Sequence, residues 1–193
     1  MNMKKIISFF IVACCAMCAT AAKVVWQIGV ADNSGTELAL GPSEYKKFLA
    51  HDFGYEDRYF LVGTSVDKND FPYVLPGPDD TWGGTWSTSG WRTHDANILF
   101  GIKKLPKHGK WKLVVDLVDA NPSRSVVKVM VNSAEKKFEI KGHSKGVLEG
   151  NLQDAKEQIL EFPISADDLK KGGNMVTVSV LEGGWIVFDQ IRL

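Results

Sequence analysis

Hydrophobic and polar side chains alternate along most of the chain, and this alternation predicts β-strands. Residues 111–117 carry a hydrophobic side chain at every second position, and in residues 175–181 valines alternate with Thr177 and Ser179. A period of two is typical of strands that bury one face. Including shorter hydrophobic runs bounded by Gly, Pro or Asp, the sequence predicts ten strands, at residues 24–28, 58–62, 71–75, 96–102, 110–118, 125–131, 136–140, 158–164, 175–181 and 185–193.

Helical patterns are few. Residues 42–51 predict one short helix that begins near Pro42 and turns Tyr45, Phe48 and Leu49 inward. Residues 166–170 predict a single helical turn that ends before two glycines. About ten short strands at regular spacing, with little helix, predict an all-β fold: a two-sheet antiparallel β-sandwich of the jelly-roll kind.

The first 21 residues have the pattern of a secretory signal peptide. Lys4 and Lys5 precede a hydrophobic run, and small residues follow up to Ala21. We therefore expect cleavage after Ala21, a single domain over residues 22–193, and an exported protein. Residues 11–14 also resemble a lipoprotein box that would place a lipid on Cys14, but the hydrophobic core before it is short. The run is too short for a membrane-spanning helix.

Composition narrows the classes of partner. The chain has 23 basic and 23 acidic residues, and removing Lys4 and Lys5 leaves the predicted domain close to neutral. Nucleic acids and anionic membranes require a concentrated basic face, so neither is an expected partner. The three cysteines all lie before residue 22, so the predicted domain uses neither disulfides nor thiol chemistry.

A loop rich in tryptophan is the main candidate for a binding site. Residues 76–94 contain Trp82, Trp86 and Trp91 among Gly, Ser and Thr, a composition typical of loops. Two interpretations remain open. The indoles fold back as plugs over the end of the sandwich, or they form a platform on which a sugar ring stacks, with polar partners such as Arg92 and Asp95 at its edge.

The other three tryptophans have a simpler interpretation. Trp26 and Trp111 lie within predicted strands, and Trp185 begins the last one. We expect all three in the hydrophobic core.

Several segments together resemble a known family. They are Trp-Gln-Ile-Gly-Val-Ala-Asp at residues 26–32, Tyr-Phe-Leu-Val-Gly at 59–63, Ile-Leu-Phe-Gly-Ile at 98–102, the strand at 111–117, and the ending from Gly184 to Leu193. The chain resembles the C-terminal jelly-roll domain of family 4 polysaccharide lyases, the rhamnogalacturonan lyases. The resemblance implies a galactose-binding-like sandwich that binds polysaccharide. The catalytic Lys and His of those lyases belong to another domain, so it implies no lyase activity.

The resemblance also suggests a metal site. Related sandwiches often bind calcium between the first and last strands, and Asp32, Glu37 and Asp189 would supply carboxylate oxygens here. Single acids near strand ends equally often cap turns. We expect no required cofactor, with structural calcium as the one candidate.

Catalytic motifs do not stand out. Asp79, Asp80, Asp116, Asp119 and Glu182 offer carboxylates, but no pattern selects the pair that a glycosidase requires. His94 beside Arg92 would be the base and cation of a lyase.

The sequence therefore predicts an exported, non-catalytic carbohydrate-binding module for pectin-type polysaccharide breakdown, with Trp82, Trp86, Trp91, Arg92 and Asp95 at the site. Its partner would be a polysaccharide or oligosaccharide, within a larger glycan-degrading assembly. Two alternatives remain: a small lyase or glycoside hydrolase that uses the 76–97 loop, and a protein–protein interaction module.

Overall fold

The computed structural model describes residues 23–193, except for residues 49, 51–52, 54–56, 84–93 and 106–109. The predicted signal peptide and Cys14 lie outside the described residues. No helix in the described part of the chain is both long enough and hydrophobic enough to cross a membrane.

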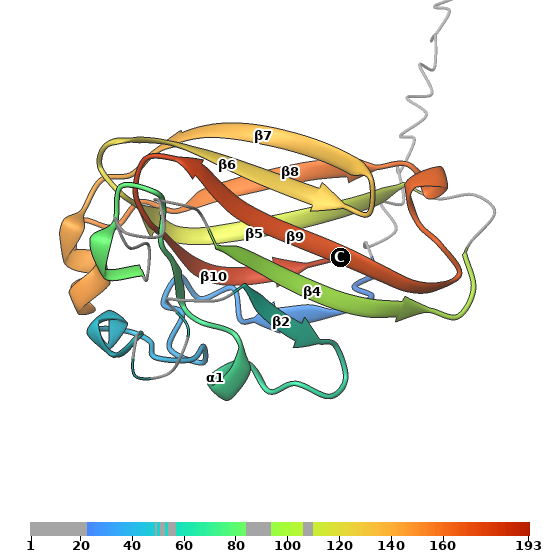
Figure 1. Ribbon diagram of the computed structural model, residues 1–193, viewed down its shortest axis with the longest axis horizontal. Helices are drawn as coiled ribbons and strands as arrows, with labels where there is room; N and C mark the ends of the chain where they lie inside the picture. The colour runs from blue at the N-terminus through green and yellow to red at the C-terminus, as the bar shows by residue number, and fades with distance from the viewer. Residues whose placement is uncertain (1–22, 49, 51–52, 54–56, 84–93, 106–109) are drawn as a thin grey trace, which may run out of the picture.

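Two sheets pack face to face (Figure 1). The first sheet runs in the order β1 (Gln27–Gly29), β10 (Ile186–Arg192), β5 (Trp111–Ala120) and β8 (Gln158–Ile164), and β3 (Val74–Leu75) also pairs with β10. The second sheet runs in the order β2 (Arg58–Leu61), β4 (Asp95–Ile102), β9 (Gly172–Glu182), β6 (Arg124–Val131) and β7 (Ala134–Lys141). The short helices are η1 (Tyr45–Lys47), α1 (Asp67–Asp70), η3 (Thr81–Gly83), η4 (Lys145–Glu149) and η5 (Ala166–Asp168).

The hydrophobic core lies between the sheets, where the alternating positions place it. Val176, Val178 and Val180 of β9 are fully buried, as are Leu113 and Leu117 of β5, and all belong to one core cluster. Each strand sends every second side chain inward because successive side chains point to opposite faces. The all-β sandwich predicted from this alternation is confirmed.

The local elements follow the prediction with a few differences. Within the helix expected over residues 42–51, the structure describes a 3-10 turn at Tyr45–Lys47, whereas Leu49 and His51 lie outside the described residues. The turn at Ala166–Asp168 is present. The expected strand at 71–75 contributes only Val74 and Leu75, which pair with β10. The sheets are antiparallel except for one pair, since β2 runs parallel to β4. The segment between β2 and β4 contains α1, β3 and η3. Because this long connection brings the chain back to the end of the sheet where β2 begins, β4 starts beside the start of β2 and runs in the same direction.

The three tryptophans expected in the core differ in burial. Trp26 and Trp185 are buried, and the Trp26 ring lies 5.2 Å from that of Phe100. Trp111 is only partly buried, at the margin of the core cluster, because it opens β5 at the end of the sheet.

Candidate functional site: one end and one face of the sandwich

Trp82 packs against the side of the core. Its ring centroid lies 5.0 Å from that of Tyr45 and 5.8 Å from that of Phe48, and both pairs meet edge to face. Phe48 is fully buried, so Trp82 joins η3 to the η1 segment and to the core. These contacts are those of a plug. The ring is still half-buried rather than enclosed, and its contact with a sugar stays a prediction.

The turn that leads to Trp82 is held by Asp80. The Gly77 amide donates to Asp80 Oδ2 at 2.9 Å, and the Asp80 amide donates to the Gly77 carbonyl at 3.0 Å. Burial raises the pKa of Asp80 to about 6. Asp80 is therefore a structural acid of this loop. The other proposed site residues of the loop, Trp86, Trp91 and Arg92, lie outside the described residues.

Asp95 opens β4 and faces outward from the second sheet. Its carboxylate accepts a hydrogen bond from the Ser179 hydroxyl, and its amide donates to Asp57 Oδ1 at 3.0 Å. Further along the same face, Thr177 Oγ1 donates to Asn97 Oδ1 at 2.7 Å. Polar pairs between neighbouring strands stabilise a sheet, and these two pairs join β4 to β9.

His94 is 2% exposed, and its Nδ1 lies 3.9 Å from Asp57 Oδ1. A lyase would need this ring within hydrogen-bond reach of a substrate proton. Asp116 and Asp119 are also buried. The lyase and hydrolase alternatives stay predictions from the sequence.

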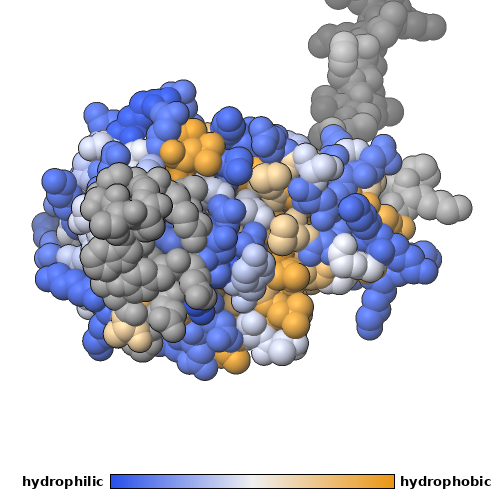
Figure 2. Space-filling view, viewed as in Figure 1, coloured by the Kyte–Doolittle hydropathy of each residue, from blue (hydrophilic) through white to orange (hydrophobic). Residues whose placement is uncertain are grey.

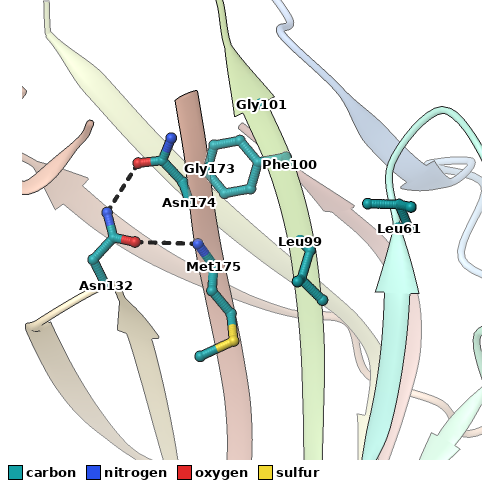
Figure 3. Close-up of a pocket in the computed structure, with 8 residues that line it drawn as sticks. All are labelled: Leu61, Leu99, Phe100, Gly101, Asn132, Gly173, Asn174 and Met175. Atoms are coloured by element: carbon teal, nitrogen blue, oxygen red, sulfur yellow. Dashed lines mark hydrogen bonds between the residues drawn. The ribbon is translucent and has the colours of Figure 1, made fainter. Parts of the chain in front are cut away.

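A hollow on the outer face of the second sheet was not foreseen from the sequence (Figure 3). It is open to solvent, with a volume of about 480 Å³, and its floor is backbone: Gly101 of β4 lies opposite Gly173 of β9. No other atom lies within 4 Å of where a Cβ would stand on either glycine. Leu61, Leu99 and Met175 form its hydrophobic walls.

Two amide side chains form the polar edge of the hollow. Asn132 Nδ2 donates to Asn174 Oδ1 at 2.9 Å, and the Met175 amide donates to Asn132 Oδ1 at 3.1 Å (Figure 3). Leu61 and Met175 are 47% and 38% exposed. The hollow thus combines hydrophobic walls, a flat floor and a polar edge, the usual composition of a small-ligand site.

The acids proposed for calcium surround the turn at residues 30–37. Ser34 donates to Asp32 Oδ1 from its amide at 3.1 Å and from its hydroxyl at 2.7 Å, and its amide also donates to Asp189 Oδ1 at 3.0 Å. Glu37 Oε1 accepts from the Val30 amide at 2.5 Å. Asp32 and Asp189 therefore accept hydrogen bonds from the same group, the Ser34 amide. Glu37 instead accepts from the Val30 amide, at the start of the turn.

The fit to a cation is partial. Asp189 Oδ2 and Asn33 Oδ1 are buried without a hydrogen-bond partner, and burial, together with the nearby Asp32, raises the pKa of Asp189. Such orphaned oxygens are what a hard cation binds. Across the described residues, however, no group of three or more His, Cys, Asp and Glu is arranged to hold a metal ion. A calcium ion here would depend on amide or carbonyl oxygens as well.

Comparison with known protein families gives a match over nearly all of the described residues. Residues 24–193 match the model of the family described as "CBM-like: Polysaccharide lyase family 4, domain III". The chain is 24% identical over 183 residues to a rhamnogalacturonate lyase of Dickeya dadantii. The alignment covers 89% of this chain but 28% of the lyase, so the chain spans under a third of that relative's length.

Similarity to solved structures is weaker. A family GH115 4-O-methyl-α-glucuronidase is 14% identical, with a TM-score of 0.41 over 90% of this chain and 18% of the enzyme. A family 35 carbohydrate-binding module from Clostridium thermocellum is 13% identical, with a TM-score of 0.31 over 49% of this chain and 68% of the module. The match over residues 24–193 is the decisive one, and by it the chain belongs to the CBM-like domain III family of polysaccharide lyase family 4.

Proposed function

We propose that this protein is an exported, non-catalytic carbohydrate-binding module that assists the breakdown of pectin-type polysaccharides, within a larger glycan-degrading assembly. Family membership supports the class of ligand. The signal-peptide pattern of residues 1–21 supports export. The single observation that carries the proposal is the hollow floored by Gly101 and Gly173 on the outer face of the second sheet.

The chemistry of a sugar ring matches this hollow. One face of a pyranose presents C–H groups, which gain from contact with the exposed side chains of Leu61 and Met175. The ring can approach the backbone closely because Gly101 and Gly173 place no side chain beneath it. Asn132 Nδ2 already donates to the Asp168 carbonyl and to Asn174 Oδ1, so at the edge Asn132 offers a hydroxyl group the remaining lone pair of Oδ1. Trp86, Trp91 and Arg92 of the 76–94 loop remain proposed as additional contacts.

We base the proposal that the module is non-catalytic on the residues that line this hollow. Among the described residues that line the hollow there is no Asp, Glu or His. Hydrolysis of a glycoside ordinarily requires two carboxyl groups on either side of the scissile bond, and proton abstraction requires a base. A sugar held in this hollow therefore meets neither arrangement.

We expect the purified protein to bind pectin fragments in isothermal titration calorimetry, and the double variant Leu61→Ala/Met175→Ala to bind about tenfold more weakly. Tenfold corresponds to about 1.4 kcal/mol, the scale of losing part of one hydrophobic contact. Ile159→Ala is the matched control, because Ile159 is a comparably exposed hydrophobic residue on the first sheet.

Three results would contradict the proposal. New reducing ends or ultraviolet absorbance of an unsaturated uronide would indicate an enzyme. A stable complex with a protein partner and no response to glycans would indicate an interaction module. Wild-type affinity in the double variant, together with weaker binding by Trp86→Ala or Trp91→Ala, would move the site to the tryptophan loop.

We also propose that calcium binds at the turn of residues 30–37 without being required for sugar binding, with Asp189 and Asn33 as ligands through their unpartnered oxygens. Calcium at 100 times its dissociation constant is expected to raise the free energy of unfolding by about 2.7 kcal/mol. Asp189→Asn should abolish this response, and Glu37→Gln should retain it, because Glu37 is already bonded to the Val30 amide. An unfolding temperature that neither calcium nor EDTA changes would reject the site.

A further inference from the structure

A second hollow continues the first toward the end of the second sheet. It is shallow and open to solvent, has a volume of about 550 Å³, and is lined by Gly101, Ile102, Lys103, Lys171 and Gly172. Gly101 lines both hollows, so the two form one groove. We call it the glycine groove: hydrophobic walls at one end, three glycines along the floor, and two lysines at the other end.

The pairing of β4 with β9 explains why the lysines meet. Ile102 lies opposite Gly172, so Lys103 leaves β4 beside the point where Lys171 enters β9. Both lysines lie one residue beyond these strands, and both line the second hollow together with Gly101. The two side chains therefore border the same end of the groove.

Neither lysine is neutralised by the described part of the protein. Lys103 and Lys171 are exposed, and the ion pairs found among the described residues involve neither of them. Two neighbouring ammonium groups repel each other, and an anion between them removes that repulsion. Figure 2 shows the surrounding surface, with hydrophobic side chains gathered over β2 and β4 and hydrophilic side chains toward the right-hand end.

We propose that the glycine groove binds a carboxylate-bearing sugar residue, with its ring over Gly101 and Gly173 and its carboxylate between Lys103 and Lys171. This inference rests on the proposed carbohydrate-binding function and specifies which residues of this domain hold the carboxylate of a bound uronate. The hydrophobic walls select for the ring and the lysines for the charge. A neutral sugar gains only the first contribution, and a small anion gains only the second.

The test compares pectin fragments with free uronate carboxylates and the same fragments after methyl esterification, which removes the charge and adds one methyl group at each carboxyl. By calorimetry at 0.05 M salt, where screening is weak, the wild-type protein should bind the free acid at least tenfold more tightly than the ester. Lys103→Glu/Lys171→Glu should remove this preference while changing ester binding less than about threefold. Lys145→Glu, a charge reversal in η4, should keep it.

A second variant tests the floor of the groove. Gly173→Val places a side chain where no other atom lies within 4 Å, so the protein should fold normally, as its unfolding temperature will report. It should bind both ligands at least tenfold more weakly, because the side chain occupies the space of the ring.

Different results would overturn the carboxylate site and the proposed carbohydrate-binding function. Equal binding of acid and ester by the wild-type protein, or an unchanged preference in Lys103→Glu/Lys171→Glu, would overturn the carboxylate site and leave carbohydrate binding in place. Undiminished binding by Gly173→Val would also overturn it. Failure of the wild-type protein to bind either ligand would overturn both.

Discussion

Gly142→Ala is expected to prevent the protein from folding stably. A Cβ at this position would stand 1.6 Å from the Ala120 carbonyl oxygen and 2.2 Å from the carbonyl carbon. Both are backbone atoms, and Ala120 lies at the end of the central strand β5, so no flexible side chain can move aside. The Gly142 amide also donates to the Asn121 carbonyl at 3.0 Å, which fixes the two segments together.

The cost should exceed about 4 kcal/mol, a large part of the 5–15 kcal/mol that stabilises an ordinary domain. Thermal unfolding followed by circular dichroism will measure it, together with the yield of soluble protein. Gly101→Ala is the matched control, because a Cβ there meets open space, and its unfolding temperature should stay within about 2 °C of wild type. A similar unfolding temperature for Gly142→Ala would show that the two segments can separate at little cost.

The fold was predictable to the extent that it depends on local alternation. Each of the ten predicted ranges overlaps a strand, because burial of one face imposes a period of two on the sequence itself. The direction of β2 was not predictable in this way. Its parallel pairing with β4 depends on the path of the chain between residues 62 and 94, and no pattern within β2 encodes that path.

The candidate site was less predictable, for a related reason. The floor of the glycine groove joins Gly101 to Gly173, and these residues become neighbours only through the register of β4 against β9. Each glycine alone resembles a strand interruption. Likewise, the contacts of Trp82 come from Tyr45 and Phe48 in a distant segment, so composition identified the tryptophan but not what it touches.

The glycine groove and the opposite end of the sandwich, which we call the loop end, are built from different kinds of structure. The groove lies where β4 ends and β9 begins, and it is built from paired strands. The opposite end consists of connections, among them the segment after β7 that carries Gly142. Binding residues on strands are held more precisely than residues on loops. The two ends can therefore be altered separately, and a substitution at the loop end should change stability without changing the geometry of the groove.

Asp119→Ala is expected to lower the free energy of unfolding by about 3–5 kcal/mol. Asp119 is fully buried, and its carboxylate accepts three backbone hydrogen bonds, from the Ala120 amide at 2.8 Å, the His143 amide at 3.0 Å and the Ser144 amide at 2.9 Å. The truncated side chain leaves all three donors without this acceptor, at about 1–3 kcal/mol for each donor that water cannot reach. Chemical denaturation will measure the loss.

Asp119→Asn separates the hydrogen bonds from the packing of the side chain. Its amide keeps one acceptor oxygen and replaces the other with a donor, which faces the donating amide of Ser144 or of its neighbours. The variant should therefore lose a substantial part of the stability lost by Asp119→Ala, whereas truncation of the exposed Asp167 should cost less than about 0.5 kcal/mol. Because Asp119 lies near the end of β5 that carries the loops, folded Asp119→Asn should bind pectin fragments with wild-type affinity. Weakened binding in a fully folded sample would mean that the two ends are coupled, and a loss below about 1 kcal/mol in Asp119→Ala would mean that water replaces the carboxylate.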